Sequence, residues 1–485
     1  MYRNHIRVGV LLSALAAFSS ISRAQTTPAG VAQPLPPVAP LGPDKTVGDA
    51  LPDPADLSPG SKQQIIPDSR PLAGAQELTL GSLANAHSFL LPSFSVITQA
   101  GADPFTTGAS HPDVLSTSYL TGRLGVNQVS SRSSFLLDYV AGASFSNEPA
   151  MGNSLIQGLD ATETIQWSRW TLLFGDQFSY LSSSPFGFGG VGGVKNLGVS
   201  LGNGAGSSPG ISSSFTPTDS VYVDGLPRIN NTAIGQATYA LSHRASLNFI
   251  GSYGILDFVN SPLQDSSIIG FQGGFNYLLS RLNSISVFYR FDTLSFLNLL
   301  QGIQDHSAEV AFGRRITGRL SWQVGGGPSI EVYQRPISGS GTSVSPRAFT
   351  GLVYRLRYTG FGLSYSHSLT TGSGVLPGAQ TDVFSGRVTR TLAKSWDTSL
   401  EGSYSRNQAI RQTLGTSVSA SPNTWFTTAR VSRLFVGYGA FSLSYNVAGQ
   451  SSLATICTLP SCKVASLVQT VSLGYTWGLR PVQLE

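Results

Sequence analysis

The chain has few charged residues, and this shortage sets the first limits on its class. Only 11% of its 485 residues are charged, whereas ordinary soluble domains carry roughly 25%. No basic run or basic stripe is present, so the sequence predicts no nucleic-acid partner. After the N-terminal segment, no apolar run is long enough for a transmembrane helix, which excludes a helical membrane protein.

Cysteine is nearly absent, and this limits the redox chemistry. Cys457 and Cys462 are the only two, with four residues between them and no histidine nearby. This spacing does not favour a redox or metal pair. In an exported chain the two are predicted to form a local disulfide.

Histidine is also scarce, and this argues against an enzyme. A serine nucleophile needs a histidine base beside it and an orienting group. His367 lies between Ser366 and Ser368, but adjacent residues of a strand point to opposite faces. We therefore interpret His367 as an interfacial residue and predict no enzyme, no metal site and no cofactor. An outer-membrane hydrolase is kept as a less favoured alternative.

The N-terminus has the features of an export signal. Arg3 and Arg7 precede an apolar stretch from Val8 to Ser20, and Ser22-Arg23-Ala24 is a small-x-small cleavage site. Residues 1–24 are therefore predicted to be a signal peptide. The net charge of +5 includes three arginines of this segment and falls to +2 without them.

Residues 25–84 are rich in proline and lack sustained periodicity. They are predicted to form a disordered periplasmic arm. The arm is interpreted either as a linker or tail, or as a segment that binds the cell wall or a periplasmic partner. The remainder, residues 85–485, is predicted to be one barrel domain.

The last strand candidate, Leu467–Trp477, shows the pattern of that domain. Apart from Gln469, one parity is apolar, and apart from Val468 the other parity is small or polar. Such period-two alternation predicts a strand with one apolar and one wetter face, and the stretch is long enough to cross a bilayer. A single strand in lipid would leave the backbone N–H and C=O groups on both its edges without partners. The rest of the chain is therefore predicted to supply further strands that close into a barrel. A secreted propeller or β-helix is the soluble alternative, but no blade-type repeat is present.

Short turns and long loops alternate from Phe89 onward, which is typical of bacterial barrels whose short turns are periplasmic. Eight short-turn hairpins, the C-terminal strand and a first strand at Phe89–Thr98 add up to eighteen strands, and the first and last are predicted to pair. Sixteen is the alternative. The predicted fold class is all-β: a transmembrane antiparallel up-and-down barrel. The short turns are expected near 130–131, 168–169, 242–244, 280–282, 317–319, 359–360, 393–395 and 437–439.

Charged residues of these strands mostly occupy the parity opposite the aromatics. Glu163 and Asp176 are exceptions: either the parity is assigned wrongly in their strands or they lie near a rim. Because an arginine facing hydrocarbon at mid-membrane costs roughly 2–4 kcal/mol, the rest are predicted to line the lumen. They pair with one another, tune a water-filled channel, or do both. With eight arginines and six acids in the set, selectivity by net charge is expected to be weak, although Arg355, Arg357 and Arg387 would favour anions locally. The predicted lumen-lining set is Arg123, Asp138, Arg290, Asp292, Glu309, Arg315, Glu331, Arg335, Arg355, Arg357, Arg387, Asp397, Glu401 and Arg430.

One connection, residues 182–230, is much longer than the others and rich in glycine. Lys195 is not followed by Ser or Thr, so it is not a phosphate-binding loop. In the predicted order it is the third extracellular loop. In architecture and loop order the chain resembles general bacterial porins, whose third loop folds into the barrel and narrows it. No diagnostic motif accompanies the resemblance, and the acidic constriction cluster of many porins is missing. A flexible surface loop is the alternative.

The sequence thus predicts a bacterial outer-membrane channel for passive diffusion of small solutes. A non-conducting barrel that acts as a scaffold or adhesin is the alternative. The expected partners are outer-membrane lipid, lipopolysaccharide and the barrel-assembly machinery. The aromatic end of Leu467–Trp477 resembles the signal read by that machinery, although Gly478–Glu485 follow it here. Solute, selectivity and oligomeric state are left open.

Overall fold

The structure is a computed structural model of the whole chain. It describes residues 88–102, 114–147, 153–181, 227–259, 263–297, 301–334, 341–372, 376, 378–393, 395–410, 422–435, 439–450 and 467–484. Several predicted features lie outside these ranges: the signal peptide, the proline-rich arm, the Cys457–Cys462 disulfide, Arg335, and the glycine-rich loop as far as residue 226. The described residues contain no helix long and apolar enough to span a membrane.

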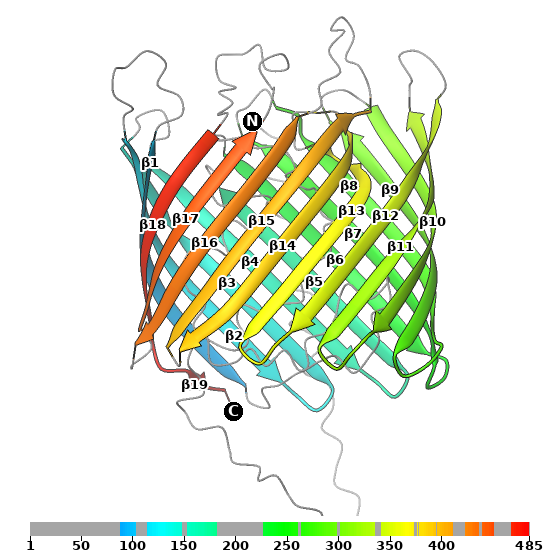
Figure 1. Ribbon diagram of the computed structural model, residues 1–485, viewed down its shortest axis with the longest axis horizontal. Coiled ribbons are helices and arrows are strands. Elements are labelled where there is room, and N and C mark those ends of the chain that lie inside the picture. Colours follow the sequence, from blue (N-terminus) through cyan, green and yellow to red (C-terminus); the bar gives the residue numbers. More distant parts are fainter. Residues whose placement is uncertain are drawn as a thin grey trace, which may run out of the picture. The chain divides into compact units, whose positions relative to one another are not determined.

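Eighteen long strands follow one another in antiparallel order and form one closed sheet (Figure 1). A nineteenth strand of two residues, β19 (Val482–Gln483), extends the pairing of β1 past the last long strand. The long strands are β1 (Phe89–Ala102), β2 (Val114–Val129), β3 (Ser133–Ser146), β4 (Asn153–Gln166), β5 (Trp170–Leu181), β6 (Arg228–Ala240), β7 (Ala245–Phe258), β8 (Ser266–Leu278), β9 (Asn283–Phe296), β10 (Gln301–Arg315), β11 (Leu320–Gln334), β12 (Thr342–Arg355), β13 (Thr359–Thr370), β14 (Ala379–Ala393), β15 (Trp396–Ala409), β16 (Asn423–Phe435), β17 (Gly439–Gln450) and β18 (Leu467–Gly478).

The first and last long strands close the barrel. β1 pairs with β18 from Ser93↔Gly478 to Gly101↔Thr470 and with β2 on its other edge. The predicted closure by Phe89–Thr98 and Leu467–Trp477 is therefore confirmed, and so is the count of eighteen; the alternative of sixteen is wrong. Closure satisfies the hydrogen-bonding groups on both edges of every long strand, which an open sheet would leave unpaired.

Alternating side chains give the barrel two different faces. In β18, Val471, Leu473 and Tyr475 are exposed, whereas Ser472 and Thr476 are buried. The same alternation recurs around the sheet because the side-chain period of a strand is two. We call the parity that carries exposed apolar residues the outer face and the opposite, mostly polar parity the inner face.

The short turns lie together at one end of the barrel (Figure 1). In several of them a side-chain oxygen accepts hydrogen bonds from the backbone of the turn. Ser242 Oγ accepts hydrogen bonds from the backbone N–H groups of Arg244 (3.2 Å) and Ala245 (3.1 Å). Ser280 and Thr317 make the same kind of hydrogen bonds in the next two short turns along the chain. These serine and threonine turns make the tight reversal a local property of the sequence.

One short turn lies slightly earlier in the chain than the sequence predicts. The β12–β13 connection is Leu356–Tyr358, not Thr359-Gly360, because Thr359 already pairs with β14. Arg357 therefore belongs to the turn and not to the alternating part of a strand, which corrects its predicted place on the lumen wall.

Candidate functional site

The inner face gathers nearly all the charges predicted to line the lumen. The strand register puts twelve of the fourteen on this face; Arg357 lies in a turn and Arg335 lies outside the described residues. Figure 1 shows that the strands which carry them are spread around the barrel. The inner-face residues are Arg123, Asp138, Arg290, Asp292, Glu309, Arg315, Glu331, Arg355, Arg387, Asp397, Glu401 and Arg430.

A buried ion network surrounds Arg347, which was absent from the predicted set. We define the Arg347 cluster as Arg347 with Asp292, Asp305 and Glu309. The guanidinium lies 2.7 Å from Asp305, 3.3 Å from Asp292 and 3.5 Å from Glu309. Arg290 adds a second cation at 2.6 Å from Asp292. The side chain of Arg347 is only 6% exposed, so these pairs lie in a region of low dielectric.

Arg347 directly follows residues 337–346, a stretch rich in Ser and Gly that ends in proline. This composition is typical of a loop, so the sequence does not indicate that Arg347 lies on the wall of the barrel. A signal was present: Arg347 has the same parity as Arg355 in the β12 pattern. Its partners, however, come from β10 and β9, which are two and three strands away from β12 in the sheet. No local pattern indicates that approach.

Glycines of β11 make room for side chains of β12 to cross it. Gly325 and Gly327 lie on the inner face, where Gly327 pairs with Arg347. A Cβ at Gly325 would collide with the ring of Phe349 and lie 3.0 Å from Ala311 of β10. Phe349 thereby packs against Phe288 and Ala311, with the two phenyl centroids 6.4 Å apart.

Gly325→Leu is expected to lower barrel stability by about 1–3 kcal/mol, because overpacking displaces well-packed neighbours. Gly318→Leu is the matched control, since nothing lies within 4 Å of a Cβ at this turn position. Urea unfolding in lipid vesicles, followed by tryptophan fluorescence, measures both. Equal midpoints for the two variants would contradict the packing role of Gly325.

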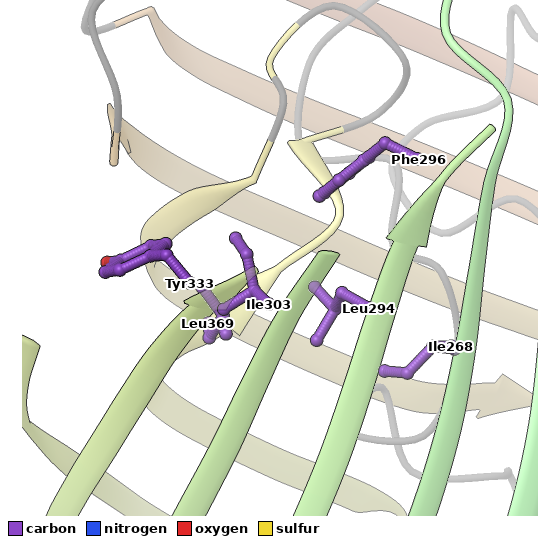
Figure 2. Packing of buried hydrophobic residues seen from close by; sticks show 6 residues of the cluster. All are labelled: Ile268, Leu294, Phe296, Ile303, Tyr333 and Leu369. Atoms are coloured by element: carbon purple, nitrogen blue, oxygen red, sulfur yellow. The ribbon is translucent and has the colours of Figure 1, made fainter. Parts of the chain in front are cut away.

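An apolar cluster lies on strands of the same region, at the end of the barrel opposite the short turns. It contains Ile268, Leu294, Phe296, Ile303, Tyr333 and Leu369, and Figure 2 shows them on neighbouring strand ends with Leu369 approaching from β13. Phe296, Ile303 and Tyr333 belong to the strands that carry the Arg347 cluster and Glu331.

The β13–β14 turn leans inward onto this apolar cluster. Gly378 has a φ of +85°, a region that favours glycine. A Cβ there would lie 2.9 Å from Ile303 Cδ1, although β11 and β12 separate β13 from β10 in the sheet. Gln380, just after the turn, donates to Glu331 and, at 3.0 Å, to Ser345 Oγ. Polar and apolar contacts together therefore anchor the turn on the inner face.

A second inner-face group is richer in arginine. Arg387 Nε lies 2.7 Å from Glu401, and the Arg387 side chain is 64% exposed. Arg430 interacts electrostatically with Glu401, Arg387 and Arg123. Arg123 is buried and donates to Asp138 at 2.7 Å. We define Arg123, Arg387 and Arg430 as the arginine group; Arg387 is its most accessible cation.

Glu163 and Asp176, the two exceptions in the sequence pattern, lie on the outer face. Glu163 pairs with Phe174, and Asp176 lies between Ala161 and Ala233 on the neighbouring strands. Asn231 Nδ2 donates to Asp176 Oδ1 at 2.8 Å. The carboxylate of Asp176 therefore accepts a hydrogen bond from Asn231 on the outer face.

Asn231→Ala is expected to destabilise the barrel by about 1–3 kcal/mol, because it removes the donor from a carboxylate shielded from water. In the double variant Asp176→Ala/Asn231→Ala the two losses should not add, since both remove the same interaction. Urea unfolding in vesicles gives the three free-energy changes. Strictly additive losses would refute the coupling.

His367 has a carboxylate partner that local sequence did not indicate. Its Nδ1 lies 2.8 Å from Asp382 Oδ1, and the Tyr365 hydroxyl donates to the same oxygen at 2.9 Å. These residues lie on the outer face, whereas Ser366 and Ser368 point to the inner face. No adjacent serine therefore faces the imidazole. Within the described ranges, no group of three or more His, Cys, Asp or Glu could hold a metal ion.

Comparisons with known proteins find similarity in structure only. No family model matches the sequence, and no curated protein matches it. Among solved structures, Pseudomonas aeruginosa OpdQ matches with 10% identity and a TM-score of 0.41 over 81% of this chain and 99% of that chain. P. aeruginosa OpdL matches with 12% identity and a TM-score of 0.38 over 83% and 100%. Acinetobacter baumannii OccAB3 matches with 8% identity and a TM-score of 0.37 over 81% and 100%.

Proposed function

We propose that this protein is an outer-membrane channel through which small solutes diffuse passively. One observation carries the proposal: a closed eighteen-stranded barrel with apolar residues exposed on its outer face and Arg, Asp and Glu residues on its inner face. Apolar outer faces suit hydrocarbon, and closure leaves no strand edge in lipid. Barrels of sixteen to eighteen strands are too wide for side chains alone to fill.

The wall chemistry supports a preference for anions on one side of the lumen. In the Arg347 cluster, the carboxylates and the guanidinium are buried and engaged with each other. In the arginine group, Arg387 is mostly exposed. Solutes respond to accessible charge more than to charge already neutralised in the wall. Anionic solutes are therefore expected to pass along the face formed by β14, β15 and β16.

The test of the channel is conductance in a planar bilayer. Purified full-length protein should give stepwise currents in potassium chloride. Folding is checked separately by the heat-dependent shift in gel mobility that folded barrels show. A folded but silent protein would overturn the channel proposal and favour the scaffold or adhesin alternative.

The inward-leaning β13–β14 turn is expected to narrow the lumen. Shortening it by replacing residues 372–378 with two glycines should raise single-channel conductance. The glycine-rich loop predicted to constrict the barrel is tested in parallel by deleting residues 187–210. A conductance gain from only one deletion identifies the narrowing segment; no gain from either would contradict both constrictions.

A further inference from the structure

We propose that the short-turn end of the barrel binds the phosphate groups of anionic phospholipids in the surrounding leaflet. The inference rests on the proposed function and on the predicted periplasmic position of the short turns. We define the basic rim as one arginine from each of six described short turns: Arg132, Arg169, Arg244, Arg281, Arg319 and Arg357.

The charge on this rim has a single sign. All six arginines are exposed, and the described residues of their turns include no Asp or Glu. The turns are 130–132, 167–169, 241–244, 279–282, 316–319 and 356–358. None of the rim arginines is an inner-face strand residue. The lumen therefore does not account for this distribution of charge.

Exposed apolar side chains accompany the arginines. Five of the six turns contain one, and the first turn, Ser130–Arg132, does not. An apolar group beside a cation on a long stem matches the boundary between hydrocarbon and headgroups, where the stem lies in lipid and the charge reaches the phosphates. The exposed apolar turn residues are Trp167, Leu241, Leu279, Leu282, Ile316, Leu356 and Tyr358.

A second tier of arginines lies on the outer face near the same end. Arg314, Arg390 and Arg433 are exposed and close to the last residues of β10, β14 and β16. The Arg433 guanidinium lies 5.3 Å from the ring centroids of both Trp396 and Phe435. Arg357 lies 5.1 Å from the centroid of Tyr358. Aromatic rings at the boundary thus hold two guanidinium groups at the level of the headgroups.

The spacing of the rim selects the ligand. Neighbouring short turns are two strands apart, which is about 10 Å across the strands. One compact anion cannot bridge that distance, but a row of separate headgroups can occupy it. Arginine and phosphate form charge-assisted, often bidentate, hydrogen bonds. A shell of anionic lipid around this end of the barrel satisfies both the spacing and the charge.

The experiment measures lipid preference on the full chain in vesicles of equimolar phosphatidylglycerol and phosphatidylcholine. Electron spin resonance of spin-labelled versions of each lipid gives their relative association with the protein. The wild type should prefer phosphatidylglycerol several-fold, and the preference should weaken with added salt because the Debye length shortens. Replacing all six rim arginines by glutamine should bring the ratio close to one.

Controls separate this result from folding and from the channel proposal. Arg387→Gln removes an inner-face arginine and should leave the lipid preference unchanged. Gel mobility and conductance of the wild type and of the rim variant are measured on the same samples. A folded wild type that is silent in a bilayer but prefers phosphatidylglycerol would count against the channel alone. If the sixfold variant does not fold, pairs such as Arg244→Gln/Arg281→Gln should show proportionate losses.

Two outcomes would overturn the proposal. One is equal association of the two lipids with folded wild-type protein. The other is loss of the preference on addition of millimolar inorganic phosphate at constant ionic strength, which would mean that the rim binds free phosphate instead of lipid. Retention of the preference in that competition supports lipid headgroups as the ligand.

Discussion

Arg347→Leu is expected to be the most damaging single substitution in the barrel. It removes the cation that lies within 3.5 Å of three carboxylates, Asp292, Asp305 and Glu309. Breaking a buried ion pair by deleting one partner costs about 3–5 kcal/mol, because the remaining charge is left uncompensated. Arg290 still contacts Asp292, but Asp305 and Glu309 lose the guanidinium that lies beside them.

Urea unfolding in vesicles measures this loss, with gel mobility as a check on assembly. Arg387→Leu is the matched control, since it removes an inner-face arginine that is 64% exposed and pairs with one acid; exposed pairs contribute about 0–1 kcal/mol. Adding Asp305→Asn to Arg347→Leu should recover part of the stability. An Arg347→Leu barrel as stable as Arg387→Leu would show that the buried network contributes nothing specific.

If the protein is the proposed channel, Arg387→Glu is expected to reverse or strongly weaken its preference for anions while leaving conductance largely intact. The substitution changes the most accessible charge of the arginine group by two units and places it beside Glu401. The shift should be largest in dilute salt, because screening over about 10 Å is already strong at 0.1 M. Reversal potentials under a potassium chloride gradient report it directly.

Arg281→Glu is the control for the second experiment, because Arg281 lies in a short turn away from the inner face. It carries the same change of charge and should leave the reversal potential near that of the wild type. Equal shifts in the two variants would show that net charge, and not the inner wall, sets selectivity. Arg430→Glu should act in the same direction as Arg387→Glu, because Arg430 interacts with Arg387 and Glu401.

The strand pattern could be predicted because its causes are local. Alternation in Leu467–Trp477 directly reflects the two-residue period of a strand. Tight turns such as Leu241–Ala245 are closed by hydrogen bonds between residues two to four apart. Counting these turns therefore determines the number of strands, and the need to satisfy both edges determines that the first and last pair.

Contacts across intervening strands could not be predicted in this way. Arg347 is 42 residues from Asp305 and 55 from Asp292, and its partner position in β11 is Gly327, which has no side chain. Asp382 approaches His367 only because β13 and β14 pair in one register. Asn231 approaches Asp176 for the same reason, from the far side of a long connection.

By itself, then, the amino-acid sequence determined the closed eighteen-stranded barrel, its two faces and the face on which most charges lie. Periodicity and turn chemistry act over a few residues and can be read without knowing the partners. The tertiary structure alone decided which inner-face charges are buried with each other, which remain accessible, and that the β13–β14 turn leans inward. Those properties depend on register and on the curvature that brings distant strands face to face, and neither is encoded in any short stretch of the chain.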